Sequence, residues 1–273
     1  MKKYLITILM LFAVMFFANQ YFREKRLLRI GVECDYAPNN WLENFPTSTN
    51  VPIVNDTGHY AEGYDIQIAK LIADELNANL EVKRIAWNDL LDALNKGEID
   101  AIFSGMLDTG ERREQAAFSD AYDVVETEYV VLVNTASNYA NAQALEDFSG
   151  AKLMAQRGTN LDAAIDQVPG AVHMPPVETV GEMLNEVLND RVDGTVINYD
   201  TGLTYERKYD NVKVIRFQKG KGFHIDYTGI CAGVRKSDTK LLEDINAALS
   251  AISRHDRQKV MDKAVARAYQ VFP

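Results

Sequence analysis

Short apolar segments and amphipathic helical segments alternate along this chain, and the alternation constrains the fold more than any other feature. The first half predicts strands at 27–34, 80–85 and 99–103 and helices at 65–76 and 88–95. The first strand ends in DYAPNNW at 35–41, a predicted loop rich in Pro and Asn, and a polar stretch that contains Pro and Gly follows at 44–63. Because strands joined through helices usually run in the same direction, this order predicts an α/β fold with largely parallel sheets.

The second half of the chain repeats this order. It predicts strands at 128–134, 151–156 and 194–197, a short helical piece at 145–148, and helices at 159–167 and 180–188. Thr159 is suited to cap the helix at 159–167. The chain then ends in a predicted strand at 232–235 and two helices within 241–269, whose apolar stripes need a sheet to cover.

An internal echo relates the two halves at a constant offset of 93 residues. The first set is Leu90, Leu91, Leu94, Ile99 and Asp100, and the second set is Met183, Leu184, Val187, Val192 and Asp193. Each set is a helix, a turn and a strand preceded by Asp, which predicts two lobes of one construction. If the C-terminal helices return to the first lobe, the chain crosses twice, near 125–128 and 226–230. These crossings would form a hinge, with the binding site in the cleft between the lobes.

The N-terminus has the pattern of an export signal. Lys2 and Lys3 precede an unbroken apolar run at 4–18, which polar residues follow. Phe16 fits a signal-peptidase site poorly, and no cysteine precedes Cys34, so a lipid-attachment site is absent. Aromatic and basic residues at 21–26 would suit an uncleaved anchor at the membrane interface. Cleavage and anchoring therefore both remain open, and both place the protein outside the cytoplasm.

Composition excludes several classes of function. The chain has 273 residues and 47% hydrophobic content, enough for one large or two medium domains. Removing residues 1–25 takes away four of 29 Lys and Arg and one of 39 Asp and Glu, which leaves a net charge near −13. We therefore expect no nucleic-acid partner.

Cysteine and histidine usage predicts neither a disulfide framework nor a metal site. Cys34 and Cys231 could form one bridge or remain two buried thiols. The four histidines lack zinc-ligand spacing, so we expect no metal and no cofactor.

The stretch 104–120, SGMLDTGERREQAAFSD, places Arg112 in a polar turn just after a predicted buried strand. A guanidinium can hold a carboxylate with two parallel hydrogen bonds, and loops at strand carboxyl ends present side chains to clefts. Arg112 therefore suggests a receptor for a small anionic or zwitterionic molecule. The alternative is a surface arginine paired with Glu111 or Glu114.

Over about 28–265 the sequence resembles the family 3 extracellular solute-binding proteins, which are the polar amino acid receptors of ABC importers. The motifs that carry the resemblance are LRIGVECDYAP, EGYDIQIAKLIADEL, IAWNDLLDALNKGEIDAIFSGM, GERREQAAFSDAY, YANAQALEDFSGAKLMAQRGT and CAGVRKSD. The resemblance implies a two-lobed periplasmic binding protein type 2 fold, each lobe a mostly parallel sheet flanked by helices, with two hinge crossings. We expect an export signal or anchor at 1–25, lobe 1 at 26–126 and 229–273, and lobe 2 at 127–228.

The resemblance also implies how a ligand carboxylate would be held. Arg112 would grip it, aided by backbone N–H groups around Gly105 and Leu107 and by Thr159 at a helix N-terminus. Ser104 and Gly158 belong to the same two loops.

The remainder of the implied site concerns the ligand side chain. Tyr36 and Trp87 would sandwich it, with ordinary core packing as the alternative. Glu33 and Asp35 would face its far end, unless they are solvated loop charges.

Two positions depart from the family pattern. Leu107 replaces a Ser or Thr that bonds the carboxylate, and Asn198 replaces an Asp or Glu that accepts from the ligand ammonium. Asp200 could substitute for that acid if its loop is shifted.

These residues predict a monomeric transport receptor that captures an amino acid or close analogue and delivers it to an ABC permease. Acidic Glu33, Asp35 and Asp108 favour a polar or cationic ligand. A membrane-anchored sensing module is an alternative, although no second apolar span follows. A periplasmic dehydratase-like enzyme is another, although no Ser/His/Asp or Cys/His set is visible and we expect no enzyme.

Overall fold

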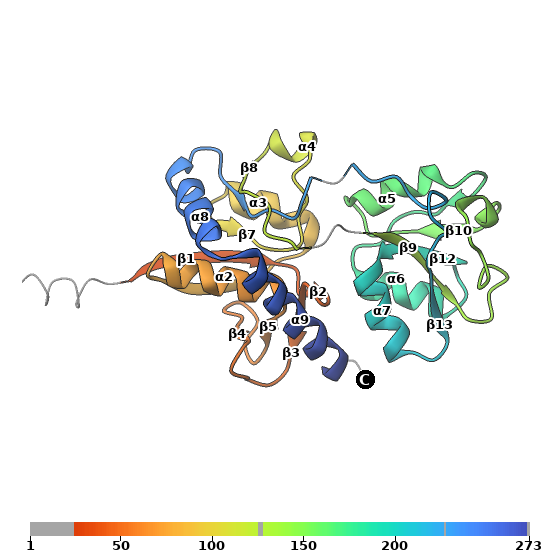
Figure 1. Cartoon of the computed structure of the whole chain (residues 1–273), viewed down its shortest axis with the longest axis horizontal. Coiled ribbons are helices and arrows are strands. Elements are labelled where there is room, and N and C mark those ends of the chain that lie inside the picture. The colour runs from red at the N-terminus through yellow and green to blue at the C-terminus, as the bar shows by residue number, and fades with distance from the viewer. Residues whose placement is uncertain (1–24, 125–127, 227, 272–273) are drawn as a thin grey trace, which may run out of the picture.

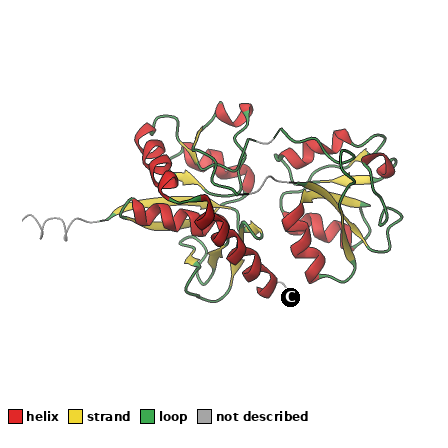
Figure 2. Ribbon diagram, viewed as in Figure 1, coloured by secondary structure: helices red, strands yellow, loops and turns green. Residues whose placement is uncertain are grey.

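The computed structural model describes residues 25–124, 128–226 and 228–271. It contains two α/β lobes that lie side by side (Figure 1). We call residues 25–124 and 228–271 lobe 1, and residues 128–226 lobe 2. Each lobe has its own strands and helices (Figure 2). The buried apolar clusters of the two lobes are separate.

Lobe 1 is built on a five-stranded sheet of order β6-β1-β7-β14-β8. Its strands are β1 (Arg26–Val32), β6 (Ala78–Arg84), β7 (Ala101–Ile102), β8 (Ala117–Phe118) and β14 (Gly233–Val234). Its helical segments are α2 (Tyr64–Glu75), η1 (Trp87–Asp89), α3 (Leu90–Asn95), α4 (Gly110–Arg113), α8 (Thr239–Ala251) and α9 (Arg254–Val271). The C-terminal helices therefore return to the first lobe, as the sequence predicts.

Lobe 2 has a second five-stranded sheet of order β11-β10-β12-β9-β13. Its strands are β9 (Tyr129–Asn134), β10 (Lys152–Met154), β11 (Val172–His173), β12 (Gly194–Asn198) and β13 (Val212–Ile215). Its helical segments are η2 (Leu145–Phe148), α5 (Asn160–Ala164), η3 (Ile165–Gln167), α6 (Val180–Leu188) and α7 (Tyr199–Lys208). Along β9, Val131 and Val133 pack in one apolar cluster and Val130 and Leu132 in another, so helices and loops cover both faces.

The two-lobed α/β fold is confirmed, but the sheets are mixed and not mostly parallel. In lobe 1, β1 runs parallel to β6 and β7, whereas β14 runs antiparallel to β7 and β8. In lobe 2, β10 runs parallel to β11 and β12, whereas β9 runs antiparallel to β12 and β13. The reason is the route of the chain: β9 and β14 are the first strands after each change of lobe, so they start at the cleft, where the parallel strands end.

The predicted loop at 35–41 and the polar stretch that follows it form a small antiparallel sheet of order β2-β3-β5-β4. The strands are β2 (Asp35–Tyr36), β3 (Asn40–Glu43), β4 (Val51–Pro52) and β5 (Tyr60–Glu62). Strands of two to four residues carry almost no periodic signal, which is why sequence patterning missed this sheet.

The echo between the two halves is also a structural equivalence. In lobe 1, Asp100 N donates to Arg29 O at 2.7 Å, and Asp100 Oδ2 accepts from Arg29 N at 3.1 Å. In lobe 2, Asp193 N donates to Lys152 O at 2.9 Å, and Asp193 Oδ2 accepts from Lys152 N at 2.8 Å. Each aspartate thus ties the start of one strand to its parallel neighbour, which explains why Asp recurs before both strands.

The chain passes between the lobes twice, between Val124 and Glu128 and between Asp226 and Thr228. The predicted boundary at 126/127 lies outside the described residues, as does most of the predicted signal or anchor at 1–25. The exact domain limits therefore remain predictions. No helix within the described ranges is long and apolar enough to cross a membrane.

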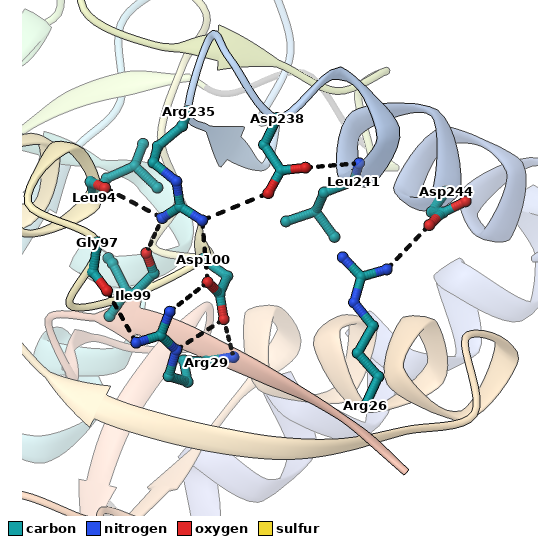
Figure 3. A network of polar contacts seen from close by, with 10 residues as sticks. All are labelled: Arg26, Arg29, Leu94, Gly97, Ile99, Asp100, Arg235, Asp238, Leu241 and Asp244. Atoms are coloured by element: carbon teal, nitrogen blue, oxygen red, sulfur yellow. Dashed lines mark hydrogen bonds and ion pairs between the residues drawn. The ribbon is translucent and has the colours of Figure 1, made fainter. Parts of the chain in front are cut away.

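A network of charged side chains joins the C-terminal segment of lobe 1 to the rest of that lobe (Figure 3). The carboxylate of Asp100 accepts from Arg29 Nη2 at 2.6 Å, from Arg29 Nε at 2.9 Å and from Arg235 Nη2 at 3.1 Å. Burial opposes ionisation of Asp100, but the two guanidinium groups outweigh it and lower its pKa. Asp238, which caps α8 through Leu241 N, lies 3.5 Å from Arg235 Nη2.

We expect Asp100→Ala to lower the free energy of unfolding by about 2 kcal/mol, because it leaves two partly buried guanidinium groups without their anion. Urea denaturation at pH 7 measures this change. Asp92→Ala is a matched control, because the Asp92–Lys96 pair is exposed, and its removal should change stability by less than about 0.5 kcal/mol. Equal effects of the two substitutions would contradict a structural role for the network.

Candidate functional site

A cavity lies between the two lobes, and most of the predicted site residues line it. The lining residues are Glu33, Tyr36, Trp87, Ser104, Gly105, Leu107, Arg112, Tyr129, Gln156, Thr159, Asn160, Leu161, Val180, Ile197, Asn198 and Ile230. Nine of the twelve predicted residues belong to this set. Loops after β1 and β7 supply the lobe 1 side, and the segment after β10 supplies much of the lobe 2 side.

Arg112 is a buried cation in this cavity. Its residue is 9% exposed, and burial lowers the pKa of its guanidinium. Nη1 donates to Leu107 O at 2.9 Å and Nη2 to Gly158 O at 3.3 Å, so both hydrogen-bond acceptors are neutral carbonyls. Arg112 makes no ion pair with Glu111 or Glu114, and the interpretation as a surface pair is therefore wrong. A buried guanidinium without an anion favours an anionic ligand group.

Local structure explains how Arg112 reaches the cavity. Thr109 begins α4 by accepting a hydrogen bond from Arg112 N, at 3.3 Å from Thr109 Oγ1. The guanidinium carbon then lies 5.0 Å from the centroid of the Trp87 ring, a cation–π contact that fixes its plane. Its neighbour Arg113 points elsewhere and pairs with Asp108 at 2.6 Å.

Glu33 is a buried acid in the same cavity. The residue is 6% exposed, and burial, followed by the nearby charge of Asp35, raises its pKa to about 8. Its Oε1 accepts a hydrogen bond from Gln156 Nε2 in the opposite lobe. Within the described ranges no cation forms a salt bridge with Glu33, and the charge of Arg84 only partly offsets its burial. The cavity thus holds a cation and an acid, neither neutralised by the protein, which suits a ligand with a carboxylate and a distal donor or cation.

Two aromatic residues line the cavity from lobe 1. Tyr36 packs against Gly105, whose backbone has φ 64°, and a Cβ at Gly105 would lie 2.7 Å from Tyr36 Cε1. Only glycine therefore allows this approach. Trp87 Nε1 donates to Gly158 O at 3.1 Å and so ties the lobes together.

Two groups of the expected carboxylate grip also have partners inside the protein. Burial raises the pKa of Asp65 to about 6, and the backbone of Gly105 opposes that rise, while the Asp65 carboxylate accepts from Tyr122 Oη at 2.6 Å. The hydroxyl of Thr159 has such partners too, since it accepts from Asp162 N at 3.4 Å to cap α5 and donates to Gln156 O at 2.7 Å.

Three predicted residues do not line the cavity. Asp35 instead accepts from Gly181 N, at the start of α6, with Oδ2 at 3.1 Å. Cys34 has φ 62°, and this left-handed residue breaks the strand alternation that would have kept Asp35 beside Glu33. Gly158 contributes only its carbonyl, which accepts from Trp87 and Arg112, and Asp200 faces a neighbouring cavity.

Sequence analysis missed seven lining residues. They are Tyr129, Gln156, Asn160, Leu161, Val180, Ile197 and Ile230. Gln156 is the one with a usable signal, because it ends a predicted strand, where parallel sheets place ligand contacts. The others are apolar or lie at helix starts and chain crossings, where no local pattern separates a cavity wall from a core.

The structure also describes the two cysteines and the side chains that could bind a metal ion. Cys34 and Cys231 are buried free thiols, and no disulfide joins them. In the part of the chain that the structure describes, no group of three or more His, Cys, Asp or Glu could hold a metal ion.

Two α/β lobes that enclose a cavity with a buried arginine are the architecture of a small-molecule binding protein. The chain belongs to the bacterial extracellular solute-binding proteins, family 3, whose model matches residues 28–265. This is a family of solute-binding proteins and not of enzymes, so the dehydratase-like alternative is excluded. The family description also agrees with an extracytoplasmic location.

Curated relatives are similar over most of their length. The arginine-binding extracellular protein ArtP of Bacillus subtilis (strain 168) is 24% identical over 246 residues, covering 88% of this chain and 86% of that protein. The L-arginine-binding protein of Pseudomonas aeruginosa is 26% identical over 250 residues, 89% of each. The probable histidine-binding protein of Neisseria gonorrhoeae is 25% identical, covering 83% of this chain and 78% of the relative.

Solved structures share the fold. An amino acid ABC transporter substrate-binding protein of Streptococcus pneumoniae, bound to L-arginine, has a TM-score of 0.74 at 24% identity, covering 88% and 93% of the two chains. An ancestral arginine-binding protein has a TM-score of 0.68 bound to arginine and 0.67 bound to glutamine, at 26% identity and coverage of 92% and 99%.

Proposed function

We propose that this protein captures an amino acid or a close analogue in the inter-lobe cavity and presents it to an ABC permease. One observation carries the proposal: buried Arg112 and buried Glu33 line one cavity, and neither has an ion-pair partner in the described structure. The relatives' names support it, because arginine, histidine and glutamine all carry a carboxylate and a distal donor group.

The proposed ligand orientation follows from these charges. The ligand carboxylate pairs with Arg112, its side chain lies between Tyr36 and Trp87, and its distal polar or cationic group reaches Glu33. Cationic amino acids are the first class to test, because an ionised Glu33 in a buried cavity favours a positive partner.

The ammonium of an amino acid has no dedicated carboxylate in this cavity. Glu33 is the only Asp or Glu among the lining residues that the structure describes, and Asn198 offers an amide oxygen instead. A neutral acceptor gives a weaker hydrogen bond than an ionised one. Analogues with a substituted or missing amino group therefore belong in the same screen.

A thermal-shift screen against the common amino acids, their N-acetyl and 2-hydroxy analogues, and polyamines tests the proposal. A ligand at 100 times its dissociation constant should stabilise the protein by about 2.7 kcal/mol. If no amino acid or analogue raises the melting temperature while another class of small molecule does, the proposed ligand class is wrong.

We further propose that the protein acts as a monomer at the outer face of the cytoplasmic membrane or in the periplasm. The anchored sensing alternative depends on the N-terminal segment, which lies outside the described residues. Mass spectrometry of the mature protein distinguishes the cases, because an uncleaved segment adds the mass of residues 1–25.

A further inference from the structure

Asp35 joins the two lobes at a point outside the cavity. It lies in β2, which faces α6 of lobe 2 across the boundary between the lobes (Figure 1). Its Oδ2 accepts a hydrogen bond from Gly181 N at 3.1 Å, and Asp35 does not line the cavity. Asp35 therefore contacts the opposite lobe and not the cavity that would hold a ligand.

The donor belongs to the first turn of α6, where backbone N–H groups have no partner within the helix. Thr179 Oγ1 accepts from Glu182 N at 3.1 Å, which leaves the N–H of Gly181 for an acceptor from outside the helix. The positive end of the helix dipole also favours a carboxylate at this position. Asp35 thus completes the cap of a nine-residue helix that belongs to the other lobe.

The charge of Asp35 is stabilised by this contact. Burial raises the pKa of its carboxyl, and the N–H groups of Gly181 and Val180 oppose that rise by stabilising the ionised form. The charge of Arg84 acts in the same direction as these N–H groups, and that of Glu182 acts against them. Separation of the lobes removes both N–H contacts from the carboxylate.

The backbone that precedes Asp35 is strained. Cys34 has φ 62°, in the left-handed region, where Asn and Asp are tolerated better than other side chains. The other non-glycine residues of the described ranges in this region are Asn77 and Asp190. Asn40 Oδ1 accepts from Cys34 N at 2.9 Å and so holds the turn in place. Such strain persists where the surrounding structure enforces it, and it often marks a functional position.

We propose that Asp35 is a positioning residue that holds the lobes together and so slows the release of a bound ligand. Arg112 and Glu33 are 9% and 6% exposed, so a ligand reaches or leaves them only when the lobes separate. That separation breaks the contact between Asp35 and Gly181, because its partners belong to different lobes. The proposal rests on ligand capture in the cavity, but it does not depend on which ligand is captured.

The expected signature is a loss of affinity that is the same for every ligand. Asp35→Ala should raise the dissociation rate constant about fivefold or more, as expected for the loss of a half-buried charge-assisted hydrogen bond, and leave the association rate constant within about twofold. L-Arginine and L-glutamine serve as a cationic and a neutral probe, and stopped-flow tryptophan fluorescence reports both rates through Trp87, which lines the cavity. Because Asp35 does not touch the ligand, both probes should lose affinity by the same factor.

Two substitutions in α6 test the same contact from the other lobe without changing any charge. Gly181→Pro removes the N–H donor, and proline is tolerated in the first turn of a helix. Gly181→Ala keeps the donor, and its Cβ would lie 3.7 Å from Asp35 Oδ2, which is an ordinary contact. We therefore expect Gly181→Pro to reproduce the faster release and Gly181→Ala to leave the rate within about twofold. Gly181→Pro combined with Asp35→Ala should add little, because both remove one contact.

A measurement without any ligand keeps this proposal separate from the proposed function. The N–H of Gly181 has no partner within α6, so its protection from hydrogen exchange depends on Asp35. We expect this amide to be protected in the ligand-free protein and, by NMR, to exchange about fivefold faster or more in Asp35→Ala. Asp56→Ala, which removes a lobe 1 carboxylate paired with His59 and Arg84, is the matched control and should leave the exchange unchanged.

Unchanged exchange at Gly181 in Asp35→Ala, unchanged release rates, or a loss of affinity confined to L-arginine would overturn the proposal. A loss confined to L-arginine would mean that Asp35 acts through its charge on the ligand. If neither probe binds, the proposed amino acid function is weakened, and the exchange measurement still decides whether Asp35 holds the lobes together.

Discussion

Arg112→Ala is expected to abolish ligand-induced thermal stabilisation while leaving the protein folded. The guanidinium is the only positively charged side chain among the described residues that line the cavity, and a carboxylate ligand would lose two charge-assisted hydrogen bonds. We expect a loss of about 3 kcal/mol or more in binding, a factor of over about a hundred in dissociation constant. Isothermal titration with a ligand from the screen measures the factor.

The neighbouring residue provides the control for this substitution. Arg113→Ala removes the same charge one residue away, but the Arg113 side chain is exposed, pairs with Asp108 and does not line the cavity. Its affinity should stay within about twofold of the original. Arg112→Lys should recover only part of the affinity, because an ammonium cannot hold a carboxylate with a planar pair of hydrogen bonds. Equal losses in Arg112→Ala and Arg113→Ala would contradict the assignment.

Affinity for a cationic ligand is expected to rise about tenfold per pH unit between pH 6 and pH 8, and then to level off. The cause is Glu33, whose pKa of about 8 in the empty cavity keeps it mostly protonated at pH 7. A cationic group binds the ionised carboxylate, so binding releases a proton over this range. Titration calorimetry in buffers of different ionisation enthalpy counts that proton, and Glu33→Gln should make the affinity independent of pH.

Glu33 also predicts how the stability of the ligand-free protein depends on pH. Because the pKa of Glu33 is raised on folding, its contribution to stability is fully present below its unfolded value near 4.5 and is lost as the pH rises through about 8. The free energy of unfolding of the empty protein should therefore fall over this window, by an amount on the order of 4 kcal/mol, and Glu33→Gln should remove that fall. A wild-type affinity and stability that are both flat between pH 6 and pH 8 would contradict the burial of Glu33.

The helices illustrate how far local patterning reaches. The predicted helix at 180–188 coincides with α6, and the one at 65–76 lies within one residue of α2 at each end. Both carry long apolar stripes and clear ends, for example the capping box between Thr179 and Glu182. The small sheet of β2 to β5 escaped prediction because its pairing is set by contacts between segments and not by any local period.

The site residues show what local sequence patterns cannot predict. Arg112, Tyr36 and Trp87 could be named from motifs, because each lies in a distinctive loop. Asp35 and Asp200 could not be placed correctly: a left-handed residue at Cys34 redirects the first, and the start of α7 turns the second toward a neighbouring cavity. Such reorientations depend on single backbone torsions that composition and spacing do not encode.

The sequence by itself determined the order of strands and helices, the two related lobes, and the arginine that a ligand carboxylate needs, because periodicity and residue chemistry are local properties. Only the tertiary structure decided which charges share a cavity. Glu33 and Gln156 meet from opposite lobes 123 positions apart, and Asp35 reaches Gly181 across 146. Burial and electrostatic partners depend on how the lobes lie against one another, so the raised pKa values of Glu33 and Asp200 emerge only from the folded chain.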